Sequence, residues 1–464
     1  METFVRRSQI DISPRELFRW HERPGAFLRL APPWRDVSLE AFEGIEDGDR
    51  AVIRLGLGPA RIRWVAEHFG FEAGRQFCDR QVRGPFRAWT HTHRMEPDGE
   101  RGSVLVDDIR YELPLGALGR AVAGRSIRRE LDAQFARRHS VTRHDVESHA
   151  RYNPDGRHLR IAVSGASGLV GSTLVSFLTA GGHTVQKLVR RPVHSPDEIE
   201  WNPKTGRVDV ARMEDLDAVV HLAGESLFAL RWTEEKKRRI LSSRVEGTKL
   251  LSSALASLDR PPAALISASA IGFYGDRGDE LLDETSGPAK PASFLARVTL
   301  AWEAATEIAS RAGIRTAHAR LGVVLSPRGG ALATMLPAFR LALGGRLGSR
   351  DQWFSWVDLD DVVGSIYHLI MTEVEGPVNV TSPEPVTMEA YTRTLARVLR
   401  RPAFMPLPNS LVRIAAGELA DEMLLASARV VPRRLQKTGY EFRSEGLEQA
   451  LRSQLGRPAS DRGP

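Results

Sequence analysis

The stretch Leu-Arg-Ile-Ala-Val-Ser-Gly-Ala-Ser-Gly-Leu-Val-Gly-Ser, residues 159–172, decides the fold of most of this chain. A short apolar run leads into three glycines spaced G-x-x-G-x-x-G, and a helical pattern follows. Gly165 permits a tight turn, Gly168 lets the backbone approach a pyrophosphate, and Gly171 lets the helix lie close to the strand. The free N–H groups of that helix would face the phosphates. The residues that we expect to bind a dinucleotide here are Gly165, Ser167, Gly168, Leu169, Val170 and Gly171.

The expected second strand, residues 184–189, ends in a pair of arginines, Arg190 and Arg191. A site selective for NAD would place an Asp or Glu here to bind the ribose 2′-hydroxyl. Two guanidinium groups can instead bind a 2′-phosphate, although both could also be solvated surface side chains. The sequence therefore favours NADP(H) over NAD(H) as the cofactor.

Outward from the glycine turn, short apolar runs alternate with helical stretches, which is typical of a parallel α/β sheet. The expected strands are 159–163, 184–189, 218–222, 264–269 and 316–325, and the clearest expected helices are 233–258 and 291–311. The strand at 218–222 ends in Leu222, Ala223, Gly224 and Glu225. Because Ala223 and Gly224 are small, we expect this loop to pass close to the adenosine ribose. The expected fold class is α/β, with a doubly wound parallel Rossmann sheet.

The first 150 residues have a different pattern, with short strand-like runs separated by turns. The expected strands are 4–12, 51–57, 61–69, 77–82, 86–95 and 103–113. A helix is expected after Ser13 and Pro14, which suit the cap and first helical position, and a long amphipathic helix is expected at 118–141. The polar joint at 147–157 contains Asn-Pro-Asp-Gly, so we expect a domain boundary there.

Composition narrows the function classes. The chain has 464 residues, a net charge of +7 and one cysteine, and it has no apolar run long enough for a membrane span. Its first residues carry charges without an apolar signal core, so a cytoplasmic location is expected. Basic and acidic residues are interleaved, so no nucleic-acid partner is expected. His91 and His93 would face the same side of a strand, but no third ligand is evident nearby, and we expect no metal site.

Several stretches together resemble a known family: Ser164–Gly171, His221–Glu225, 231–233, 243–248, Ser267–Gly275, Arg320–Leu325, 354–361 and 377–383. They resemble the extended short-chain dehydrogenase/reductases of the NAD-dependent epimerase/dehydratase superfamily. The closest branch is the atypical one called epimerase family, or nucleoside-diphosphate-sugar-epimerase-like. The resemblance implies that Glu225, Arg231, Arg320 and Val323 also line the cofactor groove. It further implies an NADP-binding domain at 158–400 and a family-specific C-terminal extension at 401–455.

The region 1–150 resembles a second family, on residues 84–93 and 107–114. It is similar to the START-like superfamily of polyketide cyclase/dehydrases and lipid-transfer domains. The resemblance implies an α+β helix-grip domain, in which a curved antiparallel sheet surrounds a long C-terminal helix and encloses an apolar cavity. A small or lipid-like molecule is therefore the expected partner.

The expected catalytic residues depart from the superfamily pattern. That pattern has a Ser or Thr after the fifth strand and a Tyr-x-x-x-Lys pair on the next long helix, with Tyr as the acid/base. Ser267 and Ser269 lie where the serine belongs. However, Phe294 and Val298 stand in place of the tyrosine and the lysine, and neither can move a proton. The ordinary mechanism is therefore not supported by this sequence.

Three residues could replace the missing pair. Tyr274 follows the serines and could donate a proton, or simply line the substrate pocket. Glu225 could act as an acid or base if desolvated, or bind a ribose hydroxyl instead. Lys290 precedes the altered helix, and a solvated surface position is expected for it. The candidate catalytic residues are Ser269, Tyr274 and Ser267.

Three functions remain open on this reading. The first is an NADP(H)-dependent oxidoreductase that acts on a small or lipid-like carbonyl or alcohol, because hydride chemistry belongs to the cofactor. The second is a nucleotide-sugar epimerase, which the missing Tyr-Lys pair weakens. The third is a non-catalytic NADP(H)-binding sensor or ligand-binding scaffold.

Overall fold

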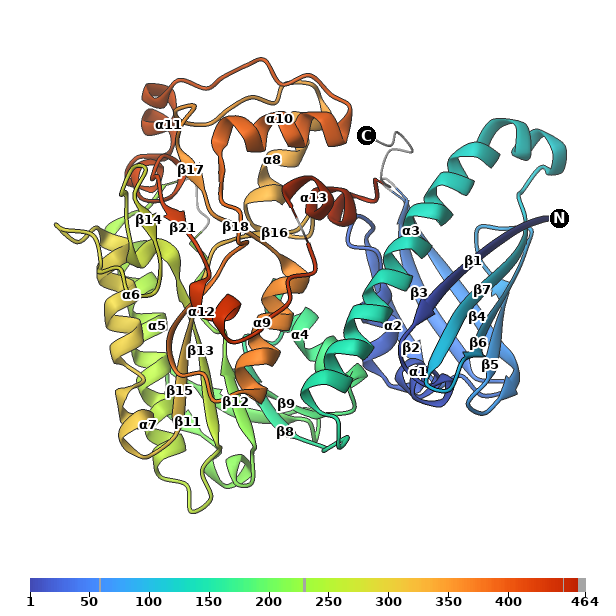
Figure 1. Cartoon of the computed structure of the whole chain (residues 1–464), viewed down its shortest axis with the longest axis horizontal. Coiled ribbons are helices and arrows are strands. Elements are labelled where there is room, and N and C mark those ends of the chain that lie inside the picture. Colours follow the sequence, from blue (N-terminus) through green and yellow to red (C-terminus); the bar gives the residue numbers. More distant parts are fainter. Residues whose placement is uncertain (58–59, 228–230, 445, 458–464) are drawn as a thin grey trace. The chain divides into compact units, whose positions relative to one another are not determined.

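The computed structural model describes residues 1–57, 60–227, 231–444 and 446–457, and the chain divides into two compact units. Unit 1 consists mainly of Met1–Arg157, and unit 2 of His158–Val175 together with His183–Leu451. Figure 1 labels their helices and strands. Each unit has a sheet of its own.

Unit 1 is an antiparallel sheet with a long helix after its last strand (Figure 1). The seven strands are ordered β1-β7-β6-β5-β4-β3-β2. They are β1 (Glu2–Ile10), β2 (Val37–Phe42), β3 (Arg50–Leu57), β4 (Ala60–Glu72), β5 (Gln76–Arg83), β6 (Ala88–Asp98) and β7 (Gly102–Glu112). The helices are α1 (Pro14–Glu22), α2 (Gly25–Leu30) and α3 (Gly116–Tyr152). Apolar residues of α3, including Leu131 and Phe135, pack against Phe4 and Trp89 of the sheet.

The sequence predicts six of these strands, with ends that differ by a few residues, but it misses β2. This strand is at the edge of the sheet and is mostly exposed, so its apolar pattern is weak. The predicted end of the long helix at Val141 is wrong, because α3 continues to Tyr152. Its last turns bury Val146 and His149, and Pro154 follows the cap.

Unit 2 has a sheet of eight strands in the order β11-β10-β9-β8-β12-β13-β15-β19. These are β8 (Arg160–Ser164), β9 (Thr184–Val189), β10 (Glu198–Asn202), β11 (Arg207–Val208), β12 (Ala218–His221), β13 (Ala264–Ala270), β15 (Arg315–Leu321) and β19 (Gly376–Val380). All neighbours pair in parallel except β10 and β11. The strand order reverses between β8 and β12, so the predicted doubly wound parallel sheet is confirmed.

The helices that lie wholly or partly in unit 2 are α4 (Leu169–Ala180), α5 (Glu234–Ala256), α6 (Phe294–Ala304), α7 (Glu307–Arg311), α8 (Gly330–Arg340), α9 (Leu359–Met371), α10 (Met388–Leu399), α11 (Asn409–Ala416), α12 (Arg433–Lys437) and α13 (Leu447–Leu455). Three two-stranded sheets join β14 (Leu281–Leu282) to β21 (Arg429–Val430), β16 (Val323–Leu325) to β18 (Trp356–Asp358), and β17 (Trp353–Phe354) to β20 (Val386–Thr387).

Two predicted elements of unit 2 are divided in the structure. The expected strand 316–325 is split at Gly322, where a Cβ atom would lie 2.8 Å from the carbonyl oxygen of Ser355. The expected helix 291–311 becomes α6 and α7, with Ser293 capping α6. The sequence also misses β10, β11 and β19.

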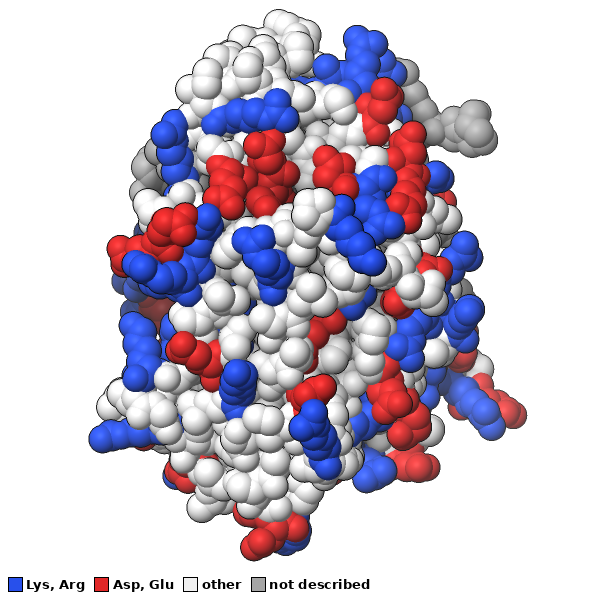
Figure 2. All heavy atoms as spheres, turned by 90° about the vertical axis from the view of Figure 1, so that its left-hand side faces the viewer, with Lys and Arg blue, Asp and Glu red and all other residues white. Residues whose placement is uncertain are grey.

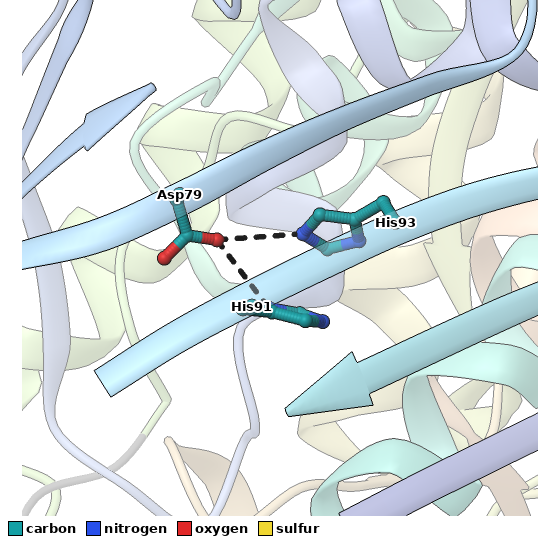
Figure 3. A group of neighbouring side chains, drawn as sticks. All are labelled: Asp79, His91 and His93. Atoms are coloured by element: carbon teal, nitrogen blue, oxygen red, sulfur yellow. Dashed lines mark ion pairs between the residues drawn. The ribbon is translucent and has the colours of Figure 1, made fainter. Parts of the chain in front are cut away.

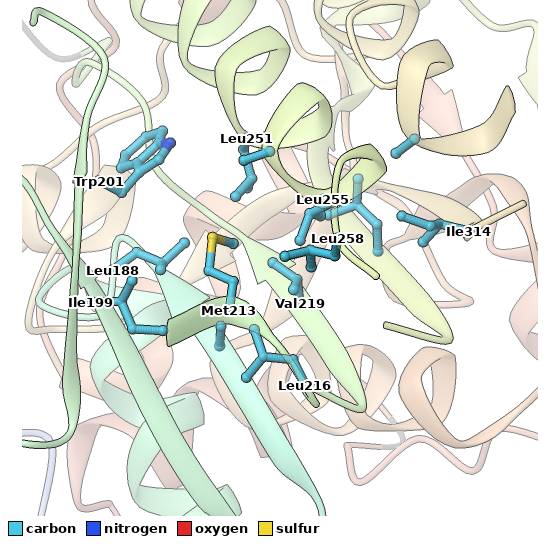
Figure 4. Close-up of a cluster of buried hydrophobic side chains, with 14 residues drawn as sticks. Leu188, Ile199, Trp201, Met213, Leu216, Val219, Leu251, Leu255, Leu258 and Ile314 are labelled. Carbon is cyan, nitrogen blue, oxygen red and sulfur yellow. The ribbon is translucent and has the colours of Figure 1, made fainter. Parts of the chain in front are cut away.

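One apolar cluster lies between α5 and its side of the sheet (Figure 4). Its labelled members are Leu188, Ile199, Trp201, Met213, Leu216, Val219, Leu251, Leu255, Leu258 and Ile314. Full burial of such a side chain stabilises a fold by about 1.5–3 kcal/mol. This cluster therefore fixes β8, β9 and β12 relative to α5, and with them the loops that follow these strands.

Positive and negative side chains are interspersed on the face shown in Figure 2, where the described residues form no continuous basic stripe. Across the described part of the chain, every helix is too short or too polar to cross a membrane.

Leu251→Ala tests the core of unit 2, with Leu241→Ala on the same helix as its control. Leu251 is fully buried, whereas Leu241 is 39% exposed. We expect Leu251→Ala to lower the free energy of unfolding by about 2–5 kcal/mol, because it leaves a cavity. Leu241→Ala should change it by about 0.5 kcal/mol or less. Urea unfolding followed by circular dichroism measures both, and equal effects would contradict the packing described.

Candidate functional site

The first part of the site is the junction between β8 and β12. The Ser164 hydroxyl accepts hydrogen bonds from the backbone N–H groups of Leu222 (3.0 Å) and Ala223 (3.2 Å), and its oxygen lies 2.7 Å from Nδ1 of His221. Nε2 of His221 lies 3.0 Å from the Thr248 hydroxyl. Burial lowers the pKa of His221 to about 4, so its ring is neutral and bonds as a structural group. These bonds hold together the two loops that face each other where the strand order reverses.

The three glycines of the turn have the tight contacts that the sequence predicts. Gly165 has a φ of +68°, and a Cβ atom there would lie 2.9 Å from the carbonyl carbon of Leu222. A Cβ at Gly171 would lie 2.2 Å from the carbonyl oxygen of Gly165. Helix α4 begins directly after this turn, at Leu169, while Ser167 and Gly168 are exposed. Side chains at Gly165 and Gly171 would therefore collide with the backbone of the facing loop and of the turn itself.

Leu169 and Val170, also expected to contact the dinucleotide, are partly buried in the first turn of α4. The N–H group of Gly168 already donates to the carbonyl of Gly165 at 2.9 Å. The exposed backbone of the turn thus lies at the carboxyl end of β8, where ligands bind in open α/β sheets.

The two arginines after β9 have different surroundings. Arg191 forms a bidentate ion pair with Glu198, with nitrogen–oxygen distances of 2.9 and 2.5 Å. Arg190 is exposed, and its guanidinium has no hydrogen-bond or ion-pair partner among the described residues. Arg190 is close enough to Glu225 to contribute to the electrostatic lowering of its pKa. Of the two, Arg190 is the guanidinium that remains available to an anion.

The carboxylate of Glu225 pairs with Lys236, a residue that the sequence pattern does not indicate. Nζ of Lys236 lies 2.7 Å from its carboxylate, and this hydrogen bond, with Arg239 and Arg190 nearby, keeps the pKa of Glu225 below its usual range. The carboxylate is therefore ionised, and proton donation from it is disfavoured. Its backbone N–H donates to the Ser243 hydroxyl at 3.0 Å.

Arg244 contacts the loop 222–225 and is a second residue of this region that the sequence pattern does not indicate. It donates to the carbonyl of Glu225 at 3.0 Å, and its guanidinium lies 5.0 Å from the ring of Trp302. A Cβ at Gly224 would lie 3.2 Å from this guanidinium. A side chain at position 224 would therefore require Arg244 to shift slightly, so Gly224 suits the contact with Arg244 as well as the predicted approach of the ribose.

Three residues that the family resemblance assigns to the groove, Arg231, Arg320 and Val323, have partners within the protein. Arg231 donates to the carbonyls of Ala415 (3.1 Å) and Ile414 at the end of α11. Val323 pairs with Trp356 in a small sheet. Arg320 is 4% exposed and forms a buried ion pair with Glu303. These contacts favour structural roles over the predicted contact with a dinucleotide.

The predicted catalytic residues lie in a buried network rather than at a surface. Ser269 donates to the Glu303 carboxylate at 2.6 Å, and Arg320 donates to both oxygens of that carboxylate, at 2.8 and 2.9 Å. Burial would raise the pKa of Glu303, but Arg320 outweighs it, so the pKa is lowered. Ser267 is fully buried, with its hydroxyl 3.3 Å from the Ala268 carbonyl oxygen.

The Tyr274 hydroxyl is part of the same network. It donates within 3.0 Å toward the side-chain oxygen of Asn379 and the carbonyl of Asp283, and it accepts from Arg320 at 3.1 Å. The side chain is fully buried, and burial raises its pKa. This placement favours a structural role for Tyr274 over the predicted proton transfer.

The positions of the absent Tyr-Lys pair are filled by packed apolar side chains. Phe294 and Val298 of α6 belong to a buried cluster with Trp232 and Val412. Lys290 is exposed, as predicted. Strand β13 ends at Ala270, and Ile271 follows it. Both residues are partly buried, and neither carries a titratable group.

Unit 1 contains a separate site, an apolar cavity of about 700 Å³. Much of its wall is aromatic or aliphatic, and its polar members include several histidines. Wall residues are Ala26, Phe27, Leu30, Phe42, Ile53, Trp64, Ala66, Phe77, Phe86, Trp89, Leu131 and Phe135, with His21, His68, Asp79, His91 and His93. His91 and His93 do face the same side of β6, as predicted. Asp79 joins them from β5, which the sequence analysis did not foresee.

Two protein-family models match the chain, both after residue 160. The family model described as NAD dependent epimerase/dehydratase family matches residues 161–381, and the Domain of unknown function (DUF1731) matches residues 407–454. An epimerase family protein of Mycobacterium bovis is 41% identical over 299 residues, which cover 64% of this chain and 98% of that protein.

Two solved structures are similar to this one. The crystal structure of the nucleoside-diphosphate sugar epimerase from Corynebacterium glutamicum has a TM-score of 0.79 and 32% identity, and it covers 98% of this chain and 90% of that chain. The human epimerase family protein SDR39U1 (isoform 2) was solved with NADPH, and it has a TM-score of 0.60 and 33% identity over 64% of this chain and 99% of that chain. The chain therefore belongs to the NAD-dependent epimerase/dehydratase family, among its SDR39U1-like epimerase family proteins.

Proposed function

We propose that this protein binds NADP(H) in unit 2 and acts as an oxidoreductase on an apolar carbonyl or alcohol. The observation that carries the proposal is the glycine turn at the reversal of strand order. Because Gly165 and Gly171 lack Cβ atoms, the turn packs directly against the backbone of Leu222, and the first turns of α4 pack against Gly165. The human relative solved with NADPH supports the same choice of ligand.

The residues of this turn suit a pyrophosphate. The exposed backbone at Ser167 and Gly168 precedes α4, whose N-terminal N–H groups and dipole favour an anion. The loop 222–225 faces it across the junction that Ser164 fixes. We propose the turn residues 165–171 and the loop Leu222–Glu225 as the dinucleotide contacts.

The choice of NADP(H) rests on Arg190. Its guanidinium is unengaged within the described residues, whereas Arg191 is bound to Glu198. A 2′-phosphate offers several acceptor oxygens to a guanidinium. We propose that Arg190 binds this phosphate and that Arg191 mainly fixes the local backbone.

The nicotinamide would supply or accept the hydride, so the chain itself needs only to orient the substrate and to exclude water from it. Ala270 and Ile271 offer an apolar surface at the end of β13, which suits an apolar substrate. A nucleotide-sugar epimerase is not favoured, because Phe294 and Val298 replace the residues that would move its protons.

For unit 1 we propose a START-like domain, spanning residues 1–150, that captures the apolar molecule in its cavity. A seven-stranded antiparallel sheet, a long C-terminal helix and a cavity of about 700 Å³ support this assignment. Such a volume suits a lipid-like or drug-sized ligand. The remaining domains proposed are the NADP-binding domain at 158–400 and the extension at 401–455.

A second candidate is a non-catalytic NADP(H) sensor that couples dinucleotide binding to the apolar ligand. The buried positions of Ser267, Ser269 and Tyr274 favour it, because none of these hydroxyls reaches a surface.

Arg190→Ala tests the cofactor choice, with Arg191→Ala as its control. Loss of a charge-assisted hydrogen bond costs about 1.5–3 kcal/mol. We therefore expect Arg190→Ala to weaken NADPH binding by about 10- to 100-fold while NADH binding stays the same. Arg191→Ala should have a smaller effect, because that arginine is already paired. Isothermal titration calorimetry measures all four affinities, and an unchanged preference for NADPH in Arg190→Ala would refute this assignment.

Ala66→Phe tests the cavity. Ala66 lines the cavity wall on β4, so a phenyl ring there should occupy part of its volume. We expect binding of a fluorescent fatty acid to weaken by at least tenfold, with NADPH affinity unchanged. Arg63→Phe, an exposed position on the same strand, should bind the fatty acid as the wild type does. If the wild type binds no apolar probe, the ligand-binding role of unit 1 fails.

Turnover separates the two candidate functions. Purified protein is mixed with NADPH and a panel of apolar aldehydes, ketones and quinones, and absorbance of the reduced cofactor is followed. An oxidoreductase should consume NADPH with at least one member, and Gly171→Val should abolish consumption because its side chain would collide with the turn. NADPH binding without consumption across the panel would favour the sensor.

A further inference from the structure

Three side chains in unit 1 converge on one point of the cavity wall (Figure 3). Asp79 on β5 is the cross-strand neighbour of His91 on β6, and His93 follows two residues along β6. One potential ligand atom from each residue lies within 4.8 Å of the others. His91 and His93 are buried, and all three residues line the cavity.

A second aspartate, Asp107 on β7, fixes the protons of both rings. Its Oδ1 lies 2.9 Å from Nε2 of His91 and 2.7 Å from Nδ1 of His93. These distances are those of ordinary hydrogen bonds, so these two nitrogens are the N–H donors. Neutral rings then carry their lone pairs on the other two nitrogens, Nδ1 of His91 and Nε2 of His93.

Those two nitrogens both face the same oxygen of Asp79. Oδ2 of Asp79 lies 3.4 Å from Nδ1 of His91 and 3.5 Å from Nε2 of His93. Both distances exceed the usual range for an N–H···O hydrogen bond, about 2.7–3.2 Å. Three acceptors therefore point toward one another, an arrangement that requires positive charge between them, either from a cation or from additional protons on the rings.

The spacing matches a metal ion. Zinc lies about 2.0–2.1 Å from histidine nitrogen and carboxylate oxygen, so two ligands of a tetrahedral ion are about 3.3 Å apart. The two measured separations, 3.4 and 3.5 Å, are close to that edge. Two histidines and one carboxylate also form the ligand set of non-haem iron and of several zinc sites.

The surroundings support these ligands in the way that metal sites use. A histidine ligand commonly donates its other N–H to a carboxylate, which orients the ring, and Asp107 accepts from both rings. The other oxygen of Asp107 lies 2.7 Å from Nε2 of His139. Nε1 of Trp89 lies 3.3 Å from Oδ1 of Asp79, whereas Oδ2 is the oxygen that faces both histidines.

We propose that Asp79, His91 and His93 bind a divalent transition-metal ion, Zn²⁺ or Fe²⁺, at the wall of the unit 1 cavity. Three protein ligands leave a coordination position open, and here it opens into an apolar chamber. That position takes an oxygen atom of the bound molecule, so the ligand class is an amphipathic carboxylate, alcohol or carbonyl compound. The metal site itself is independent of the proposed dinucleotide function, whereas the ligand it orients rests on the proposed apolar-ligand role of unit 1.

The first test measures metal uptake by the full-length, tag-free protein. After chelator treatment and dialysis, Zn²⁺ is titrated calorimetrically and Fe²⁺ is titrated under anaerobic conditions. We expect one equivalent to bind with micromolar or tighter affinity. Crystals soaked in Zn²⁺ should give an anomalous peak within bonding distance of the three named atoms. No stoichiometric uptake, or a peak at other residues only, overturns the proposal in favour of protonated rings.

Variants assign the ligands. Asp79→Asn should weaken Zn²⁺ binding by about 100-fold or more, and Asp107→Asn by about 10- to 100-fold because it orients the rings. His68→Gln is the matched control, since His68 lines the same cavity outside the group, and its affinity should equal that of the wild type. Circular dichroism checks folding, and the anomalous peak of the wild type decides the matter if a variant does not fold. Equal binding by Asp79→Asn and wild type contradicts the site.

The open position is tested with Co²⁺ and a medium-chain fatty acid. Co²⁺ in place of zinc gives visible absorption bands that depend on its ligands, so added fatty acid should shift them. The acid should also bind the metal-loaded protein at least tenfold more tightly than the stripped protein. Unchanged bands and equal affinities would overturn the proposed contact between the bound molecule and the metal, but not the metal site itself. Failure of NADPH binding, measured separately, concerns only the function proposed for unit 2.

Discussion

The backbone contact between the turn after β8 and the loop after β12 is the constraint on which unit 2 depends. Gly165 approaches Leu222 so closely that a Cβ atom would lie 2.9 Å from its carbonyl carbon. Ser164 then bonds two N–H groups of the opposite loop and the neutral ring of His221. Because both strands are clamped by the α5 cluster behind them, the two loops have little freedom to separate. A fixed arrangement of two loops at a reversal of strand order follows from packing before any ligand is considered.

Local sequence patterns predicted the glycine turn and its strand, whereas contacts between segments far apart in the sequence could not be predicted in this way. The strand 159–163 and the turn after it are recognisable because glycine spacing and apolar periodicity are local signals. The pairing of Arg191 with Glu198 depends on how β10 lies beside β9, which no local pattern encodes. Asp79 likewise meets His91 only through the register of β5 and β6. The support of Gly224 by Arg244 requires α5 to lie below the loop.

Two of the predicted catalytic residues, Ser269 and Tyr274, share a buried network with Arg320, which was predicted to contact the cofactor. Ser269, Arg320 and Tyr274 are polar residues near the end of a sheet, where active sites usually form. Here Glu303 supplies a carboxylate that satisfies Ser269 and Arg320 together, while Asn379 satisfies Tyr274. A buried ion pair with all its hydrogen bonds made can fix the geometry of a core without taking part in chemistry. Hydroxyls engaged in this way are poor candidates for proton transfer.

The polar cluster of Asp79, His91, His93 and Asp107 in unit 1 differs from this satisfied ion pair. Asp79 is half-buried at the wall of a largely apolar cavity, and Asp107 is buried behind His91 and His93. Two carboxylates, Asp79 and Asp107, face the rings of His91 and His93. Replacing such a group by packed apolar side chains often stabilises a fold. A sheet that only had to enclose an apolar ligand would not need it, which accords with the cation proposed between Asp79, His91 and His93.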